Sequence, residues 1–265
     1  MILPLGMTIW FSLIRFSLLN GMGGFVGLLN YRYFISDPAF LTALLNTLVF
    51  VGSVLVVSIV AGTVAALIMD QPIFGRGLCR LMIISPFFVM PTVGALLWKN
   101  LLMDPVSGLF AFLASALGIQ PFDWFARAPM FAIIIIVSWQ WIPFAALIIL
   151  TALQSIDDEQ KEAAEMDGAR IIPLFIWIVA PHIARAITVV VLVETIFLLS
   201  VFAEILVTTN GGPGLATTTL AFLVYTQGLL GFDVGEASAG GVIAVILANI
   251  VAIFLIRMIG KNLEG

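Results

Sequence analysis

Long runs of apolar residues, separated by short stretches that hold most of the charges, dominate this chain. A helix needs about 20 apolar residues to cross the roughly 30 Å of hydrocarbon in a bilayer. Five runs reach that length: 43–69, 81–102, 129–153, 186–209 and 237–256. A sixth run, 1–14, meets Arg15 after only about 20 Å of helix, and we expect it to be a first span clipped at its start.

The pattern therefore predicts an all-α polytopic membrane protein with about six transmembrane helices. A further apolar run, 215–232, is interrupted by threonine, glutamine and glycine. It predicts a short helix that lies at the outer interface or re-enters the bundle, not a seventh span. Residues 1–265 are accordingly expected to form a single transmembrane domain.

Composition supports this class of protein and excludes several others. The chain is 62% hydrophobic and 10% charged, whereas a soluble domain carries about 25% charged residues. A net charge of -4 provides no basic surface for nucleic acid. The single cysteine, Cys79, and the single histidine, His182, exclude an intrachain disulfide and a metal site built from several such residues. The N-terminus lacks the charged region and cleavage site of a removable signal peptide.

The distribution of lysine and arginine predicts the orientation in the membrane. Loops on the cytoplasmic side carry an excess of these residues. The loops 70–80 and 154–185 and the C-terminal tail lie on one side of the membrane in this prediction. Together they hold seven of these residues, namely Arg76, Arg80, Lys161, Arg170, Arg185, Arg257 and Lys261. The other side holds four: Arg15, Arg32, Lys99 and Arg127. We therefore expect the C-terminus to be cytoplasmic.

The most polar loop, 154–185, predicts a helix, a glycine corner and a second helix on the cytoplasmic side. Ser155 and Asp158 have nearly the spacing of a capping box. Gly168 suits the left-handed position just after a helix end. Pro173 suits the first turn of a second short helix, which Pro181 is expected to end or kink.

The charge of the first helix distinguishes two interpretations of this loop. Between Asp157 and Asp167 there are six acidic residues and one lysine, a net charge of -5. A helix that rests on lipid headgroups is normally basic, because the cytoplasmic leaflet is negative. An acidic helix is better explained as an element that docks into a soluble partner, with Ala163, Ala164 and Gly168 allowing close backbone approach.

The loop resembles the EAA loop of binding-protein-dependent ABC importers, whose pattern is E-A-A-x3-G-x9-I-x-L-P. Glu162-Ala163-Ala164, Gly168, Ile178 and Pro181 match it in spacing, and Ala180 replaces the usual leucine. Stretches 26–31, 46–47 and 209–213 extend the resemblance to MalF-type carbohydrate permeases over nearly the whole chain. Stretch 194–204 is most similar to sorbitol/mannitol permeases. Known members have a longer N-terminus.

This resemblance implies the partners and the source of energy. In the family the permease pairs with a second permease, and the two associate with an ATPase dimer and an extracytoplasmic solute-binding protein in the bacterial inner membrane. The docking residues would be Glu162, Ala163, Ala164, Asp167 and Gly168. Gly260-Lys261 is followed by Asn262, so the chain lacks the phosphate-binding motif G-x-x-x-x-G-K-[ST]. We expect it to bind no cofactor and to be no enzyme, with ATP and Mg²⁺ held by the separate ATPase subunit.

Two carboxyl groups within the apolar run 186–209 are candidate solute contacts. Ionisable groups inside a span are costly and usually functional. Glu194 and Glu204 are ten residues apart, which on a helix separates them by about 15 Å in height and about 80° in direction. Either can hydrogen-bond the hydroxyls of a polyol. The alternatives are that Glu204 reaches the outer interface and that Glu194 pairs with a polar group of a neighbouring helix.

The apolar run 129–153 also contains candidate sugar contacts, because Gln140 and Pro143 accompany its aromatic residues. Aromatic faces pack on the C–H groups of sugars while a few polar groups bind the hydroxyls. The family resemblance, carried over by position, implies a solute pathway formed by Phe87, Thr92, Gln140, Trp141, Phe144, Glu194, Phe197, Ser200 and Val201.

Two other functions are compatible with parts of the sequence. A proton-coupled secondary transporter would explain Glu194 and Glu204, but it would leave the acidic helix without a role and predicts an inverted repeat that is not found. An intramembrane enzyme would need a serine, cysteine or metal constellation near His182, and none is present. The sequence thus favours the pore subunit of an ATP-driven importer of a sugar or polyol.

Overall fold

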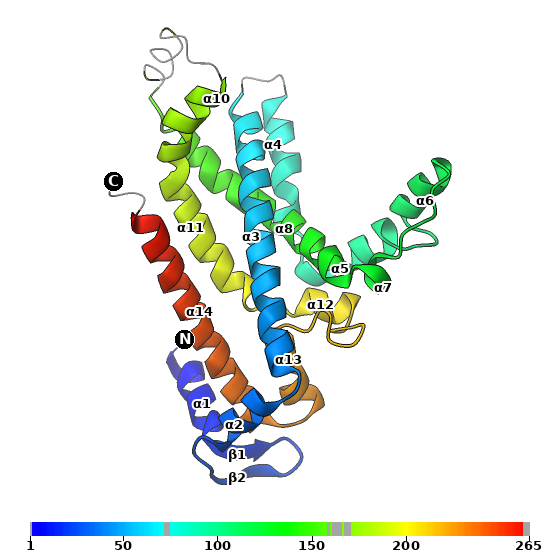
Figure 1. The fold of residues 1–265 in the computed structure, drawn as a ribbon, viewed down its shortest axis with the longest axis vertical. Helices are drawn as coiled ribbons and strands as arrows, with labels where there is room; N and C mark the ends of the chain where they lie inside the picture. The colour runs from blue at the N-terminus through cyan, green and yellow to red at the C-terminus, as the bar shows by residue number, and fades with distance from the viewer. Residues whose placement is uncertain (1, 72–74, 158–159, 161–165, 167–170, 262–265) are drawn as a thin grey trace.

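The computed structural model describes residues 2–71, 75–157, 160, 166 and 171–261, and these are mostly helical. Within them, four helices are long and apolar enough to cross a membrane. They are α3 (Phe40–Asp70), α8 (Pro129–Leu153), the continuous helix Ile172–Leu198, and α14 (Val234–Lys261), of which Val234–Ile253 is the apolar part. Together they form an elongated bundle (Figure 1). The prediction of an all-α membrane fold is confirmed.

The predicted span 81–102 is wrong as a straight helix, because the chain bends sharply in its middle. α4 (Arg76–Ile84) and the 3-10 turn η1 (Ser85–Phe88) precede the bend, and α5 (Pro91–Leu97) and the π-helical η2 (Trp98–Leu102) follow it. The two halves meet at 104°. Pro91 accounts for this bend, since proline has no N–H to donate and excludes the helical conformation from the residue before it.

The predicted span 186–209 is displaced toward the N-terminus. Its helix combines α10 (Ile171–Leu174), the π-helical η3 (Phe175–Val179) and α11 (Ala180–Leu198), and a separate short helix, α12 (Ala203–Thr208), follows. The helix ends where both the N–H and the hydroxyl of Ser200 donate to the carbonyl of Phe197. Serine side chains compete in this way with the backbone ladder.

Pro181 does not end or kink the helix, contrary to prediction. It lies in the first turn of α11, directly after the π-turn in which the N–H of Ala180 donates to the carbonyl of Phe175. The π-turn shifts the hydrogen-bond ladder by one residue immediately before the proline, which lacks a donor. The helix therefore passes through Pro181 without a break.

The N-terminal region is more ordered than its sequence pattern predicts. α1 (Ile2–Ser12) is an 11-residue helix, and the predicted loop after it contains an antiparallel hairpin, β1 (Ile14–Ser17) with β2 (Gly21–Phe25), and α2 (Leu29–Ser36). The buried amide of Asn30 donates to the carbonyls of Ser12 and Ile14 and so fixes the entry into the hairpin. α1 packs against α14, and the hairpin lies at the end of the bundle opposite α10 (Figure 1).

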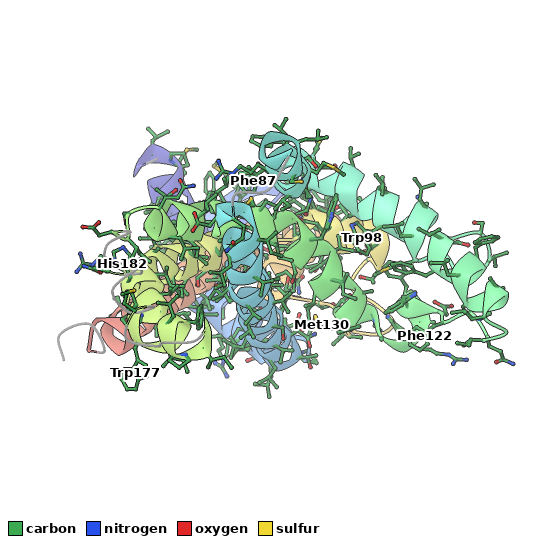
Figure 2. The ribbon with its side chains drawn as sticks, turned by 90° about the horizontal axis from the view of Figure 1, so that it is seen from above. Phe87, Trp98, Phe122, Met130, Trp177 and His182 are labelled. Carbon is green, nitrogen blue, oxygen red and sulfur yellow. The ribbon has the colours of Figure 1, made fainter. Side chains whose placement is uncertain are left out.

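The loop 103–128 forms an arm that projects from the bundle and contains α6 (Leu109–Ala116) and α7 (Trp124–Arg127). Phe122 lies toward its outer end and Trp98 near its base (Figure 2). At the turn into the arm, the carboxylate of Asp104 accepts bonds from the N–H groups of Val106 and Ser107 and from the Ser107 hydroxyl. These donors lower the pKa of Asp104 below its usual value.

The segment 215–232 contains the short apolar helix predicted for it. α13 (Leu220–Tyr225) continues into the π-helical η4 (Thr226–Leu230). The carbonyls of Leu215 and Thr218 accept hydrogen bonds from Asn46, and the hydroxyl of Thr47 accepts the N–H of Leu220. These bonds fix the start of this helix to the start of α3.

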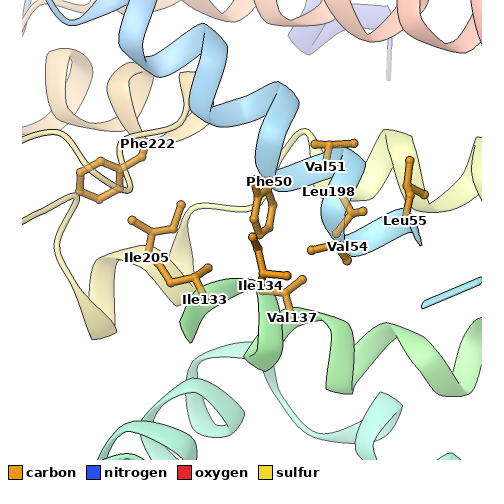
Figure 3. Packing of buried hydrophobic residues seen from close by; sticks show 10 residues of the cluster. All are labelled: Phe50, Val51, Val54, Leu55, Ile133, Ile134, Val137, Leu198, Ile205 and Phe222. Carbon is orange, nitrogen blue, oxygen red and sulfur yellow. The ribbon is translucent and has the colours of Figure 1, made fainter. Parts of the chain in front are cut away.

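The packing of α3 against α8 forms the core of the bundle. Two clusters of buried apolar side chains lie along their contact, one around Phe50 and Ile133 (Figure 3) and one around Ala66 and Ile149. Between the clusters, a Cβ atom on Gly62 would lie 2.7 Å from the Cβ of Ala145. A glycine at this position therefore allows the two backbones to approach closely.

Candidate functional site

A cavity of about 290 Å³ lies where α8, the bend between η1 and α5, and the segment after α11 meet. The bend and the early end of α11 create it, because both bring non-helical backbone next to α8. Its lining residues are Phe87, Val89, Pro91, Gln140, Trp141, Phe197, Ser200, Val201, Phe202, Ala203 and Glu204. Seven of these are among the solute contacts predicted from the sequence: Phe87, Gln140, Trp141, Phe197, Ser200, Val201 and Glu204.

Aromatic rings form one side of the cavity. The Trp141 ring lies 5.9 Å from Phe87 and 5.4 Å from Phe197, measured between centroids. Phe144 stacks on Phe87 at 5.8 Å and so supports this group from behind. Phe87 and Phe197 remain 38% and 54% exposed, which leaves their faces available to a solute.

Three polar side chains line the same cavity. Gln140 is buried in α8, and its Nε2 lies 3.5 Å from the carbonyl oxygen of Val89 at the bend. Glu204 is 5% exposed and lies in the first turn of α12. Ser200 is exposed, and its hydroxyl donates to Phe197. The cavity thus presents an amide, a carboxyl and a hydroxyl opposite aromatic rings.

Three predicted solute contacts do not line the cavity. Phe144 reaches it only through the rings of Phe87 and Trp141. Thr92 is half-buried in the first turn of α5. Glu194 is fully buried and accepts a hydrogen bond from the hydroxyl of Ser58 in α3.

The bond between Glu194 and Ser58 supports one of the two interpretations given above for this carboxyl, a polar pair between neighbouring helices. The second oxygen of Glu194 and the hydroxyls of Ser138 and Thr195 are buried without a hydrogen-bond partner among the described residues. These groups lie in α11 and α8, which pack against each other and against α3. A direct contact between Glu194 and a solute stays a prediction.

Four lining residues, Val89, Pro91, Phe202 and Ala203, were not predicted from the sequence. The sequence predicted a straight helix over 81–102, and such a helix would not have placed Val89 and Pro91 at a bend beside α8. It also predicted a helix that continues to 209, which would not have placed Phe202 in a non-helical segment. Pro86 and Pro91 were the available signals, since a proline inside an apolar run marks a possible break. Among the described residues, no group of histidine, cysteine and acidic side chains is arranged to hold a metal ion.

The predicted docking residues Glu162, Ala163, Ala164, Asp167 and Gly168 lie outside the described residues. The two ends of their loop are described. The hydroxyl of Ser155, just after α8, lies 2.9 Å from Nε2 of His182 in the first turn of α11. The hydroxyl also donates to the carbonyl of Ala152, so Ser155 links the end of α8 to the start of α11.

Residues 38–265 match the protein family described as "Binding-protein-dependent transport system inner membrane component". The chain belongs to this family. The permease is 34% identical over 239 residues to the probable ABC transporter permease protein y4oQ of Sinorhizobium fredii, covering 89% of this chain and 77% of the relative. It is 32% identical over 257 residues to the trehalose/maltose transport system permease protein MalF of Thermococcus litoralis, covering 96% of this chain and 85% of the relative.

The permease also resembles a solved structure, a bacterial ABC transporter involved in the import of the acidic polysaccharide alginate. The TM-score is 0.80 at 21% identity, and the match covers 97% of this chain and 89% of the other. At this identity the likeness shows the fold alone, and it confirms the predicted ABC importer permease fold. Family membership makes the chain an inner-membrane transport component and not an enzyme, and it argues against a proton-coupled secondary transporter.

Proposed function

We propose that this permease forms half of the solute pathway of an ATP-driven importer for a sugar or polyol, with sorbitol and mannitol as the first candidates. The observation that carries the proposal is the position of Gln140, a buried amide in the wall of an aromatic-lined cavity. The C–H faces of a polyol pack on aromatic rings, and its hydroxyls bond to amide, hydroxyl and carboxylate groups.

The size of the cavity suits a small solute. Ligand sites in proteins occupy about 300 to 1,000 Å³, and this cavity, at about 290 Å³, is at the lower end. That volume fits one sugar ring or one six-carbon polyol better than an oligosaccharide. The second permease of the pair would complete the enclosure around it.

The ends of the polar loop support a route by which ATP hydrolysis acts on the cavity. A partner ATPase that binds Mg²⁺ and ATP would hold the docking residues around Glu162. Because Ser155 and His182 connect the two ends of the loop, a displacement of the loop acts on α8 and α11 together. Those helices carry Trp141 and Phe197, whose rings contact each other in the wall of the cavity. The net charge of -5 on residues 157–167 favours a protein groove over lipid as the binding partner of the loop. The excess of lysine and arginine on the same side of the membrane supports a cytoplasmic C-terminus.

Helix α14 of this chain has a surface to which a second permease subunit could bind. A largely apolar cavity of about 580 Å³ lies between α11, α13 and α14, and small residues line it on α14, among them Gly241, Ala244, Ala248 and Ala252. Small residues allow transmembrane helices to approach closely. The whole chain, 1–265, would then act as one pore domain beside a related but different permease, supplied by an extracytoplasmic solute-binding protein.

Substitution of Gln140 tests the proposal. In cells that carry the whole importer, Gln140→Ala should abolish uptake of labelled sorbitol or mannitol while the ATPase subunits still assemble with the permease. Gln71→Ala is the matched control, because Gln71 is exposed beyond the end of α3 and far from the cavity lining. Unimpaired uptake by the Gln140 variant would remove the cavity from the pathway. Uptake that survives ATP depletion but stops with an uncoupler would instead favour the proton-coupled alternative.

A further inference from the structure

A second polar cavity, of about 510 Å³, lies at the end of the bundle from which the polar loop extends. Ala152 and Ser155 line it from the end of α8. His182, Arg185 and Ala186 line it from the first turns of α11. It is called the loop-end cavity below, and the cavity described earlier is called the Gln140 cavity.

Helix geometry places the two cavities on the same groove between α8 and α11. In α8, Trp141 lines the Gln140 cavity, and Ala152, eleven residues later, lines the loop-end cavity. In α11, Phe197 lines the first, and Ala186, eleven residues earlier, lines the second. Eleven residues make about three helical turns, so each pair shares a helix face and is separated by about 16 Å. The loop-end cavity therefore continues the Gln140 cavity toward the polar loop.

The side chains midway between the cavities are apolar on both faces. Ile148 of α8 and Val190 of α11 lie seven residues, or about two turns, from Trp141 and Phe197. Neither side chain can hydrogen-bond to a hydroxyl. A polyhydroxyl solute that moves along the groove thus finds polar partners at two separate places.

Three exposed side chains of the loop-end cavity can hydrogen-bond to solute hydroxyls: Ser155, His182 and Arg185. Ser155 Oγ lies 2.9 Å from Nε2 of His182. The guanidinium group of Arg185 makes no hydrogen bond or ion pair with any other described residue, so its N–H donors are available. No acidic side chain is among the described residues that line the cavity.

We infer that the loop-end cavity is a second binding site for the transported polyhydroxyl solute, occupied after the Gln140 cavity and before release into the cytoplasm. The inference rests on the proposed function and its orientation in the membrane. At about 510 Å³ the cavity is within the range of ligand sites, about 300 to 1,000 Å³. Solute hydroxyls accept hydrogen bonds from Arg185 and exchange with the bond between Ser155 and His182, so the hydration that the solute loses on entry is replaced.

Protection of an introduced cysteine by solute tests the inference. The complete importer, with its second permease and ATPase dimer, is placed in lipid nanodiscs without the solute-binding protein, and the exposed Cys79 is replaced by serine. Ala152→Cys then places a thiol in the wall of the loop-end cavity, and its rate of reaction with a charged methanethiosulfonate reagent is measured. Saturating sorbitol should slow this reaction at least about fivefold, as for a site that is occupied more than about four-fifths of the time.

Matched variants assign the protection to this site. Thr151→Cys changes the neighbouring residue, which is exposed but outside the cavity lining, and sorbitol should leave its reaction rate unchanged. Added to Ala152→Cys, Arg185→Gln should remove most of the protection, whereas Arg127→Gln in the arm should not. Gln140→Ala, also added to Ala152→Cys, should leave the protection in place, because the loop-end cavity binds solute separately.

The possible failures are distinguishable. The second site is overturned, and the proposed function left standing, if an importer that takes up sorbitol shows no protection of Ala152→Cys. The same holds if Thr151→Cys is protected equally or if Gln140→Ala removes the protection. If the importer with its solute-binding protein takes up neither sorbitol, mannitol nor glucose, the proposed function fails as well. Should Ala152→Cys not assemble, Ala186→Cys on the α11 wall of the same cavity takes its place.

Discussion

Gly94 in α5 packs directly against the side-chain amide of Gln140 in α8. A Cβ atom on residue 94 would lie 2.9 Å from Nε2 of Gln140. On the other side, the same nitrogen approaches the carbonyl of Val89 at the bend. The amide that lines the cavity is thus held between α5 and the bend, and this arrangement requires a residue without a side chain at position 94.

Replacing Gly94 with alanine should displace this amide and impair transport. We expect uptake to fall on the order of tenfold, which corresponds to the loss of about one hydrogen bond to the solute. Initial uptake rates in cells at equal permease abundance measure the effect. Gly52→Ala is the control, because a Cβ on Gly52 in α3 meets nothing within 4 Å. Equal uptake by the two variants would show that the position of Gln140 does not matter.

Gly240 and Gly241 of α14 should respond very differently to alanine. A Cβ atom on Gly240 would overlap the buried ring of Phe34 at 2.4 Å, whereas one on Gly241 would come no closer than 3.8 Å to Thr8. Overpacking of this kind costs about 1–3 kcal/mol. Thermal unfolding of the purified protein should therefore show a lower midpoint for Gly240→Ala and little change for Gly241→Ala. A reversed order would contradict the observed packing of α2 on α14.

The pair formed by Ser58 and Glu194 should stabilise the contact between α3 and α11. Ser58→Ala removes the donor and leaves a fully buried carboxyl without its partner, at a cost of about 1–3 kcal/mol. A double-mutant cycle with Glu194→Gln, followed by thermal unfolding in detergent, isolates the interaction. A coupling energy of at least about 0.5 kcal/mol is expected. Strict additivity of the two substitutions would mean that the bond contributes nothing.

Lys99 should stabilise the C-terminal end of α12 through its hydrogen bonds to the backbone there. Lys99→Met breaks both bonds to the carbonyls of Val207 and Thr208, and hydrogen bonds from a charged donor contribute about 1.5–3 kcal/mol each. We expect a lower unfolding temperature and weaker solute binding, since Glu204 lies in the same short helix. Lys99→Arg should restore part of both. Arg127→Met, which changes a cation that lies over the ring of Phe122 in the arm, is the control and should have little effect.

The long spans α3, α8 and α14 could be predicted from the sequence because length and apolar composition alone define them. The two breaks could not be predicted in this way. Residues 81–102 are mostly apolar, so hydropathy alone marks no break, and the prolines at 86 and 91 are the residues that indicate a turn of the backbone. Nothing so conspicuous marks the end of α11 at Leu198, where a single serine competes for one carbonyl.

In the candidate site, too, some residues could be predicted from the sequence and others could not. Gln140, Trp141 and Glu204 could be recognised because each is a polar or amphipathic residue in an apolar run. Val89 and Phe202 have no distinguishing chemistry, and they reach the cavity only because the backbone bends beside them. The hairpin β1–β2 was missed for a related reason. Its glycine-rich strand Gly21–Phe25 has no alternation of polar and apolar residues to mark it as a strand.

The close contact between Gly62 and Ala145 also constrains how the molecule can move. With two backbones touching and an apolar cluster on either side of that point, α3 and α8 cannot slide or separate without opening voids in both clusters. We therefore expect them to move as one rigid body during a transport cycle. The hinges are then expected at the non-helical segments on either side of the cavity, Val89–Met90 and Leu199–Phe202. A movement at these hinges would change the shape of the cavity itself.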